Sequence, residues 1–147
     1  MRKAKNSLAV AAALALGLTI PAAWSQKENA ATPTKDNSVY AELSKAPKKA
    51  VERRNPLERD PDAVAAGANL FALHCVECHG ETAEGGRKGP SLRAAEVQGA
   101  TPGTLFWILT NGVVRRGMPV WSKLPEPQRW QIVSYLKSLG PPKTSTN

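Results

Sequence analysis

Cys75-Val76-Glu77-Cys78-His79 is the stretch that decides the fold, and it holds both cysteines of the chain. A C-x-x-C-H run is the attachment signature of c-type haem. Residues three apart lie on the same face of a helix, so two thiols at this spacing can each form a thioether with one porphyrin vinyl group. The histidine that follows is then held under the iron. The motif therefore predicts one covalent haem with His79 as an axial ligand.

The residues before the motif carry the signals of a helix. Asp60 is a good N-cap and Pro61 suits the first helical position. Small or apolar residues then recur at helical spacing, at Val64, Gly67, Ala68, Phe71 and Cys75. We expect this helix to deliver both cysteines at its C-terminal end, where Gly80 is placed to stop it.

The residues after the motif predict two more helices joined by loops. A polar loop over 81–98, with a short helical turn over 91–97, is expected to wrap one side of the haem. Further helices are predicted over 101–111 and 126–139. No stretch alternates apolar and polar residues for long enough to indicate a β-sheet, so the expected fold class is all-α. About eighty residues are marginal for a self-sufficient core, and a haem between the helices would enlarge it.

The N-terminus has the pattern of an export signal. A basic start precedes an apolar run of thirteen residues, 8–20, which is too short to span a bilayer comfortably. A small-x-small pattern then predicts cleavage between Ser25 and Gln26, which makes 1–25 a signal peptide. The protein is expected to be exported to the periplasm, with retention of the segment as an anchor as the alternative. No later apolar run is long enough to cross a membrane.

Charge and composition divide the exported chain. The formal net charge of the whole chain is +8, but residues 60–142 contain eight basic and seven acidic residues. Residues 26–59 contain eight basic and five acidic residues and few large apolar ones, which predicts a flexible tether. A disordered tail is expected at 143–147. A nucleic-acid-binding protein concentrates positive charge on a folded face, so no nucleic-acid partner is expected.

A second axial ligand is predicted at Met118. The exported chain has only this methionine and two histidines, and His74, directly before the first haem cysteine, is poorly placed to reach the other face of the haem. Met118 lies 39 residues after His79, between Gly117 and Pro119, which suit an irregular backbone. Methionine also fills gaps in cores, which is the alternative. His/Met ligation is common in cytochromes c, and a thioether ligand raises the reduction potential.

Three other interpretations of the cysteine pair were weighed. A structural zinc site needs four ligands, and the motif has no good fourth partner. A thioredoxin-like dithiol belongs in a β-α-β context, which the sequence does not predict. A structural disulfide is plausible in an exported protein, but it leaves His79 and Met118 without a role.

Residues 60–142 resemble a small class I cytochrome c of the bacterial, exported, monohaem kind. The resemblance implies three main helices and loops wrapped around one covalently attached haem. It covers a little over half of the chain, and the haem motif is its most specific part. The matching pieces are Gly67-x-x-x-Phe71, Cys75-Val76-Glu77-Cys78-His79-Gly80, Gly89-Pro90-Ser91-Leu92, Gly117-Met118-Pro119 and residues 130–139.

The family resemblance also implies roles for further residues. Gly67 would let the first helix cross the last one closely, with Tyr135 or a neighbour at the crossing. The carbonyl of Pro90 would bind the other ring nitrogen of His79 and fix the imidazole. Four residues would pack on the haem edge or contact a propionate: Trp107, Trp121, Arg115 and Arg116. For the tryptophans ordinary core packing is the alternative, and for the arginines an exposed basic pair.

The expected function is periplasmic transfer of one electron through a His79/Met118-ligated haem, without catalysis. The expected partners are an electron-donor dehydrogenase and an acceptor cytochrome or oxidase. A haem subunit of a periplasmic oxidoreductase complex, for example with a dehydrogenase and with the tether as an interaction arm, is the main alternative. A haem-based sensor or peroxidase is the third, and it requires an open sixth position on the iron.

Overall fold

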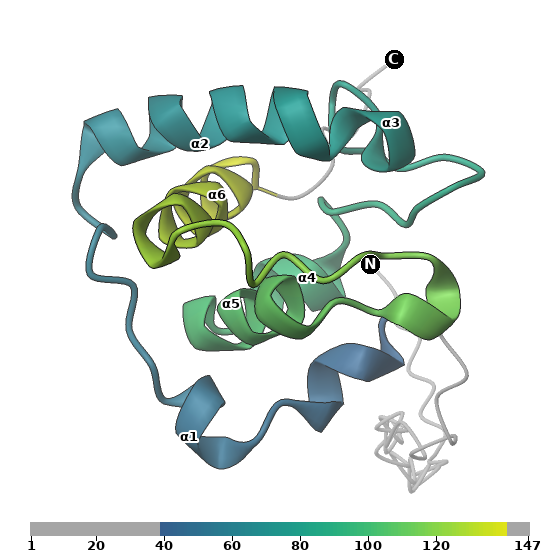
Figure 1. Cartoon of the computed structure of the whole chain (residues 1–147), viewed down its shortest axis with the longest axis horizontal. Coiled ribbons are helices and arrows are strands. Elements are labelled where there is room, and N and C mark those ends of the chain that lie inside the picture. The colour runs from purple at the N-terminus through teal and green to yellow at the C-terminus, as the bar shows by residue number, and fades with distance from the viewer. Residues whose placement is uncertain (1–38, 141–147) are drawn as a thin grey trace, which may run out of the picture. The chain divides into compact units, whose positions relative to one another are not determined.

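A computed structural model describes residues 39–140 (Figure 1), which lie within one compact unit. Within this range the chain is helical apart from loops and one isolated bridge between Val113 and Met118. The all-α prediction is therefore confirmed. The expected signal peptide and C-terminal tail lie outside the described residues. The elements are η1 (Ala41–Lys45), α1 (Lys48–Val51), α2 (Pro61–His74), α3 (Val76–His79), α4 (Ala95–Gly99), α5 (Pro102–Asn111), η2 (Val114–Arg116) and α6 (Glu126–Ser138).

Helix α2 begins and packs as its sequence predicts. The Asp60 carboxylate accepts hydrogen bonds from the backbone N–H groups of Asp62, at 2.9 Å, and Ala63, at 3.3 Å. The helix runs across α6 in Figure 1. A Cβ placed on Gly67 would lie 2.0 Å from the carbonyl oxygen of Gln131, so only glycine permits this crossing. The close approach expected at Gly67 is therefore present.

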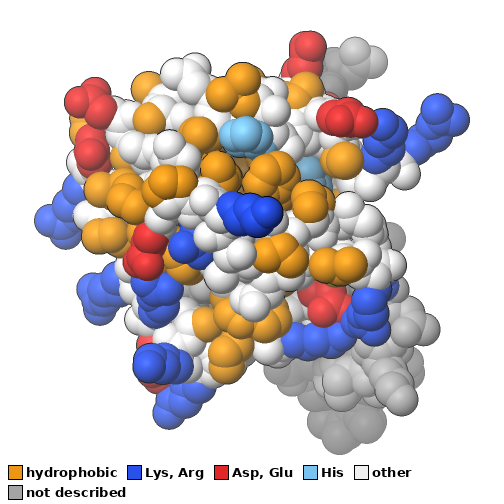
Figure 2. All heavy atoms as spheres, in the orientation of Figure 1, with side chains coloured by type: hydrophobic (Ala, Val, Ile, Leu, Met, Phe, Trp, Pro, Cys, Tyr) orange, Lys and Arg blue, Asp and Glu red, His pale blue; other side chains and the backbone are white. Residues whose placement is uncertain are grey.

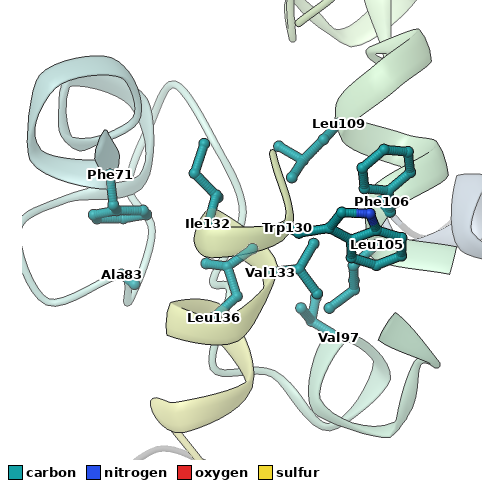
Figure 3. Packing of buried hydrophobic residues seen from close by; sticks show 10 residues of the cluster. All are labelled: Phe71, Ala83, Val97, Leu105, Phe106, Leu109, Trp130, Ile132, Val133 and Leu136. Carbon is teal, nitrogen blue, oxygen red and sulfur yellow. The ribbon is translucent and has the colours of Figure 1, made fainter. Parts of the chain in front are cut away.

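The hydrophobic core is centred on α5 and α6 (Figure 3). The rings of Phe106 and Trp130 stack with their centroids 4.0 Å apart. Each large apolar side chain that is fully buried contributes roughly 1.5–3 kcal/mol relative to an exposed one. The core consists of Phe71, Ala83, Val97, Leu105, Phe106, Leu109, Trp130, Ile132, Val133 and Leu136.

The N-terminal segment, residues 39–59, differs from its prediction. It folds onto α5 and α6, and the side chain of Asn55 is only 6% exposed. Its amide nitrogen donates to Ser134 Oγ, at 2.8 Å, and to the carbonyl oxygen of Trp130, at 3.3 Å. Thr101 Oγ1 donates to the carbonyl oxygen of Val51, at 2.9 Å.

Within residues 39–59 these contacts differ from the flexible tether predicted over 26–59 and from the domain start predicted at residue 60, whereas residues 26–38 lie outside the described part of the chain. The prediction counted large apolar side chains, of which this segment has few. The few apolar side chains that it has, Tyr40, Leu43 and Leu57, nevertheless pack against the core. Hydrogen bonds also hold the segment, as does backbone packed against Gly103, whose added Cβ would lie 2.0 Å from the carbonyl oxygen of Ala50. The helices between residues 39 and 140 are all too short or too polar to span a membrane.

Candidate haem-binding site

A cavity of about 760 Å³ lies beside α3 and is lined by residues from most parts of the fold. Its volume is in the usual range for small-molecule sites. In Figure 2, histidine side chains lie among hydrophobic side chains on the viewed face. The apolar lining comes from Phe71, Leu92, Val97, Leu105, Ile108, Leu109, Val113, Ile132 and Leu136.

The haem motif lies at one wall of this cavity. Cys75 ends α2, and α3 brings Cys78 and His79 to the same lining. His79 Nδ1 lies 2.8 Å from the carbonyl oxygen of Pro90. A carbonyl can only accept, so Nδ1 carries the proton and Nε2 keeps its lone pair. This tautomer leaves Nε2 able to ligate a metal, as the sequence predicts.

The loop that holds His79 depends on glycines. A Cβ on Gly89 would lie 3.1 Å from the Nδ1 and Cε1 atoms of the His79 ring. A Cβ on Gly85, whose φ is +83°, would lie 2.5 Å from the backbone nitrogen of Ser91. The loop can therefore bring the Pro90 carbonyl against the imidazole only because these side chains are absent.

Met118 lines the same cavity from a tight loop after α5. Its backbone pairs with Val113 through two hydrogen bonds, of 3.0 and 3.2 Å. Gly117 adopts a left-handed conformation with φ of +86°, and the backbone of Pro119 packs against Gly112. Trp121 follows, and its backbone N–H donates to the carbonyl oxygen of Leu109, at 3.0 Å. These contacts fix the loop and hold the thioether at the cavity.

The other predicted site residues divide into two groups. Pro90, Arg116 and Trp121 line the cavity together with the motif and Met118. Trp107 and Arg115 do not line it.

Trp107 follows two residues after Leu105, which places it about 200° round α5 from that lining residue. Arg115 does not line the cavity itself but pairs with the carboxylate of Glu42, which does. The haem contact expected of these two residues therefore stays a prediction, and the cavity lining does not support it.

The structure adds lining residues that the sequence prediction missed. His74 faces the cavity, with its ring centroid 5.2 Å from that of Trp121. Four more come from the N-terminal segment: Val39, Tyr40, Glu42 and Leu43. The short apolar spacing of Val39, Tyr40 and Leu43 is consistent with one helical turn facing a core, which is the signal that could have found them.

The chemistry of the two thiols separates the interpretations of the cysteine pair. Burial, and then the neighbouring Cys78, raise the pKa of the Cys75 thiol to about 11. A redox dithiol works through a thiolate of lowered pKa, and Cys75 lacks that property. Within residues 39–140 there is no cluster of three His, Cys, Asp or Glu side chains suited to a metal ion.

Taken together, the residues present fit a covalently attached haem. The cavity is apolar enough for a porphyrin, and both thiols and an oriented imidazole lie on its lining. A family model described as "Cytochrome C oxidase, cbb3-type, subunit III" matches residues 62–136.

The chain belongs to this family. Its cofactor is accordingly a covalently bound haem c, and its fold is that of a class I cytochrome c. The chain is 38% identical over 90 residues to "Cbb3-type cytochrome c oxidase subunit FixP" of Bradyrhizobium sp., a match covering 58% of this chain and 30% of the relative. It is 31% identical over 90 residues to "Cytochrome c550" of Pseudomonas aeruginosa, covering 58% and 62%.

A solved structure shows a similar fold. Cytochrome CL of Methylophaga aminisulfidivorans superposes with a TM-score of 0.52 at 27% identity, over 59% of each chain. The match to the FixP relative spans less than a third of that protein's length. The shared part is the cytochrome c domain, and residues 39–61 precede the family match.

Proposed function

We propose that this cytochrome c domain transfers one electron between proteins in the periplasm. The observation that carries the proposal is the meeting of His79, with its orienting Pro90 carbonyl, and Met118 in one cavity. The two residues would ligate the iron, and Cys75 and Cys78 would form the thioethers. The haem supplies a one-electron Fe(III)/Fe(II) couple when it is bound.

The chain's own residues set the properties of that couple. The Pro90 carbonyl fixes the imidazole plane and keeps the Nε2 lone pair towards the cavity. The Met118 thioether favours Fe(II) and raises the potential. The mostly apolar lining would surround the haem with groups of low polarity, which further disfavours the more highly charged ferric state. Two protein ligands also leave no position for oxygen or peroxide, which favours electron transfer over a peroxidase or sensor.

The proposed location and partners follow from the sequence and the relatives. The pattern at 1–25 supports export, with cleavage near Ser25 and Gln26. The partners are redox proteins, namely a donor dehydrogenase and an acceptor cytochrome or oxidase. Arg116 and Trp121, on the cavity lining, are proposed to contact the haem edge or a propionate.

A second candidate is a haem subunit of a larger oxidoreductase. The matching relative in Bradyrhizobium is named as an oxidase subunit, and this supports the idea. Isolation of the protein in a stable complex with a catalytic subunit would favour this second function. A freely monomeric protein that exchanges electrons with several donors would favour the diffusible carrier.

The first experiment tests haem attachment and ligation. The protein is matured in a host that attaches haem c and extracted with acidified acetone. The haem should stay with the protein, and the reduced form should show a sharp α-band. The ferric form should show the weak far-red band of methionine ligation. A colourless or extractable product would contradict the proposal.

The second experiment replaces the sixth ligand. Met118→Ala should abolish the far-red band and lower the potential by a sizeable part of the roughly 0.8 V over which axial ligands set haem potentials. Val120→Ala changes an exposed side chain of the same loop and is the matched control. If Met118→Ala keeps the spectrum and potential of the control, methionine is not the ligand.

A further inference from the structure

A short strap, residues 39–45, lies along the haem cavity and precedes the family match. Its residues Val39, Tyr40, Glu42 and Leu43 line the cavity. Tyr40 and Leu43 also pack against the hydrophobic core. The strap therefore belongs to the wall of the site, although it comes from outside the cytochrome c motifs.

One contact joins the strap to the loop that orients His79. The Tyr40 hydroxyl donates a hydrogen bond to the carbonyl oxygen of Ser91, at 3.0 Å. Ser91 directly follows Pro90, whose carbonyl binds the His79 ring. Burial raises the pKa of Tyr40, so its hydroxyl stays protonated and able to donate.

A second contact joins the strap to the loop that carries Met118. The Glu42 carboxylate pairs with the guanidinium of Arg115, which lies in η2, three residues before Met118. The Glu42 side chain is only 17% exposed, whereas that of Arg115 is 73% exposed. Lys45, within the strap, holds the same carboxylate at 2.7 Å. The Glu42 carboxylate is thus fixed within the strap, and the exposed Arg115 side chain reaches it from η2.

These two contacts connect elements that are distant in sequence. The strap contacts both the loop that contains Ser91, through Tyr40, and η2, through Glu42. We propose that the strap is a positioning element that keeps the Met118 loop closed on the cavity and so excludes foreign ligands from the sixth position of the iron. The inference rests on the proposed ligation by Met118.

Each contact is individually weak, which sets the size of the expected effect. An exposed ion pair changes an equilibrium by up to about fivefold. A single neutral hydrogen bond has a similar effect, about fivefold. Opening of the loop should therefore become several-fold more frequent when one contact is lost, and about tenfold or more when both are lost.

The experiment measures how fast carbon monoxide binds the reduced holoprotein, together with the temperature at which the ferric far-red band disappears. The variants are Tyr40→Phe, Glu42→Ala, Arg115→Ala and the Tyr40→Phe/Glu42→Ala pair. The pair should bind carbon monoxide about tenfold faster and lose the band at a lower temperature. Lys48→Ala is the matched control, because this lysine is 90% exposed, pairs with Glu52 instead of Glu42 and does not line the cavity.

A double-mutant cycle separates positioning from general loosening. If Glu42 and Arg115 act through one ion pair, the Glu42→Ala/Arg115→Ala protein should match either single variant. Equal acceleration in Lys48→Ala, or full additivity of the Glu42→Ala and Arg115→Ala effects, would overturn the inference. So would a Tyr40→Phe/Glu42→Ala protein that behaves as the wild type does. A wild-type protein without a far-red band would instead contradict ligation by Met118.

Discussion

The haem-binding part of the chain and the N-terminal segment are held to the same core by different means. Between residues 62 and 136 the contacts follow motifs, with cysteines, histidine, glycine and methionine at spacings that the haem demands. Between residues 39 and 59 three apolar side chains reach the core, and the other contacts are a buried asparagine, a cation–π stack and hydrogen bonds to backbone carbonyls. Contacts dictated by a cofactor leave a sequence signature, whereas contacts made mainly by backbone and polar groups leave little.

A substitution at the crossing of α2 and α6 should destabilise the haem-binding part more than any other change considered below. Gly67→Val should lower the free energy of unfolding by about 3 kcal/mol or more, because its Cβ would overlap the Gln131 carbonyl. Guanidinium unfolding of the ferric holoprotein measures the loss. Gly99→Ala, at a glycine with open space around it, is the control and should unfold almost as the wild type does. Similar losses in both variants would mean that the crossing is not the cause.

A substitution at Gly103 should detach the N-terminal segment, residues 39–59, from α5 without disturbing the haem-binding part. Gly103→Ala would place a Cβ 2.0 Å from the Ala50 carbonyl oxygen and force α1 away from α5. We expect a loss of about 1–3 kcal/mol and faster proteolysis within residues 39–59, with haem attachment retained. Mass spectrometry of the early fragments locates the cleavage, and Gly86→Ala is the control. Loss of the attached haem together with the segment would mean that the two regions do not separate.

The smallest effect comes from a charge that links the two regions. Glu126 accepts a hydrogen bond from Trp130 Nε1, at 3.2 Å, and forms an ion pair with Arg53, at 2.6 Å. The Trp130 bond, followed by Arg53, lowers the pKa of Glu126 from its usual 4.5.

A lowered pKa stabilises the fold above the ordinary value, and the contribution is lost as pH falls through the folded-state pKa. Glu126→Gln should therefore melt slightly below the wild type at pH 7, with the difference shrinking below about pH 4.5. Thermal melts across pH 3–7 test this, with Glu58→Gln in the N-terminal segment as the control. A difference independent of pH would show that the charge is not responsible.

The local signals in the sequence predicted most of the helical part correctly. The Asp60 cap and Pro61 begin α2 as expected, and α5 and α6 lie within the predicted ranges 101–111 and 126–139. The short helical turn predicted over 91–97 is observed later, at Ala95–Gly99. Caps, prolines and helical spacing are local, so they can be recognised without the fold.

The candidate site was predictable where chemistry fixes the residue type. The motif and Met118 line one cavity, and the Pro90 carbonyl binds His79. Trp107 and Arg115 do not line the cavity, because the direction of a side chain depends on how α5 and η2 are turned, which residue type does not reveal. Glu42 and Tyr40 were missed because their partners, Arg115 and Ser91, are 73 and 51 residues away.

The sequence by itself determined the all-α class and the attached haem and placed the proposed first axial ligand, His79, because thiols, imidazole and helical spacing are properties of neighbouring residues. The tertiary structure alone decided that residues 39–59 pack on the core and that the strap joins the loops of His79 and Met118. The physical reason is that a backbone carbonyl or a single charge acquires a partner only when distant segments meet. In the sequence, such groups have the same appearance in a flexible tether as in a segment that packs on the core.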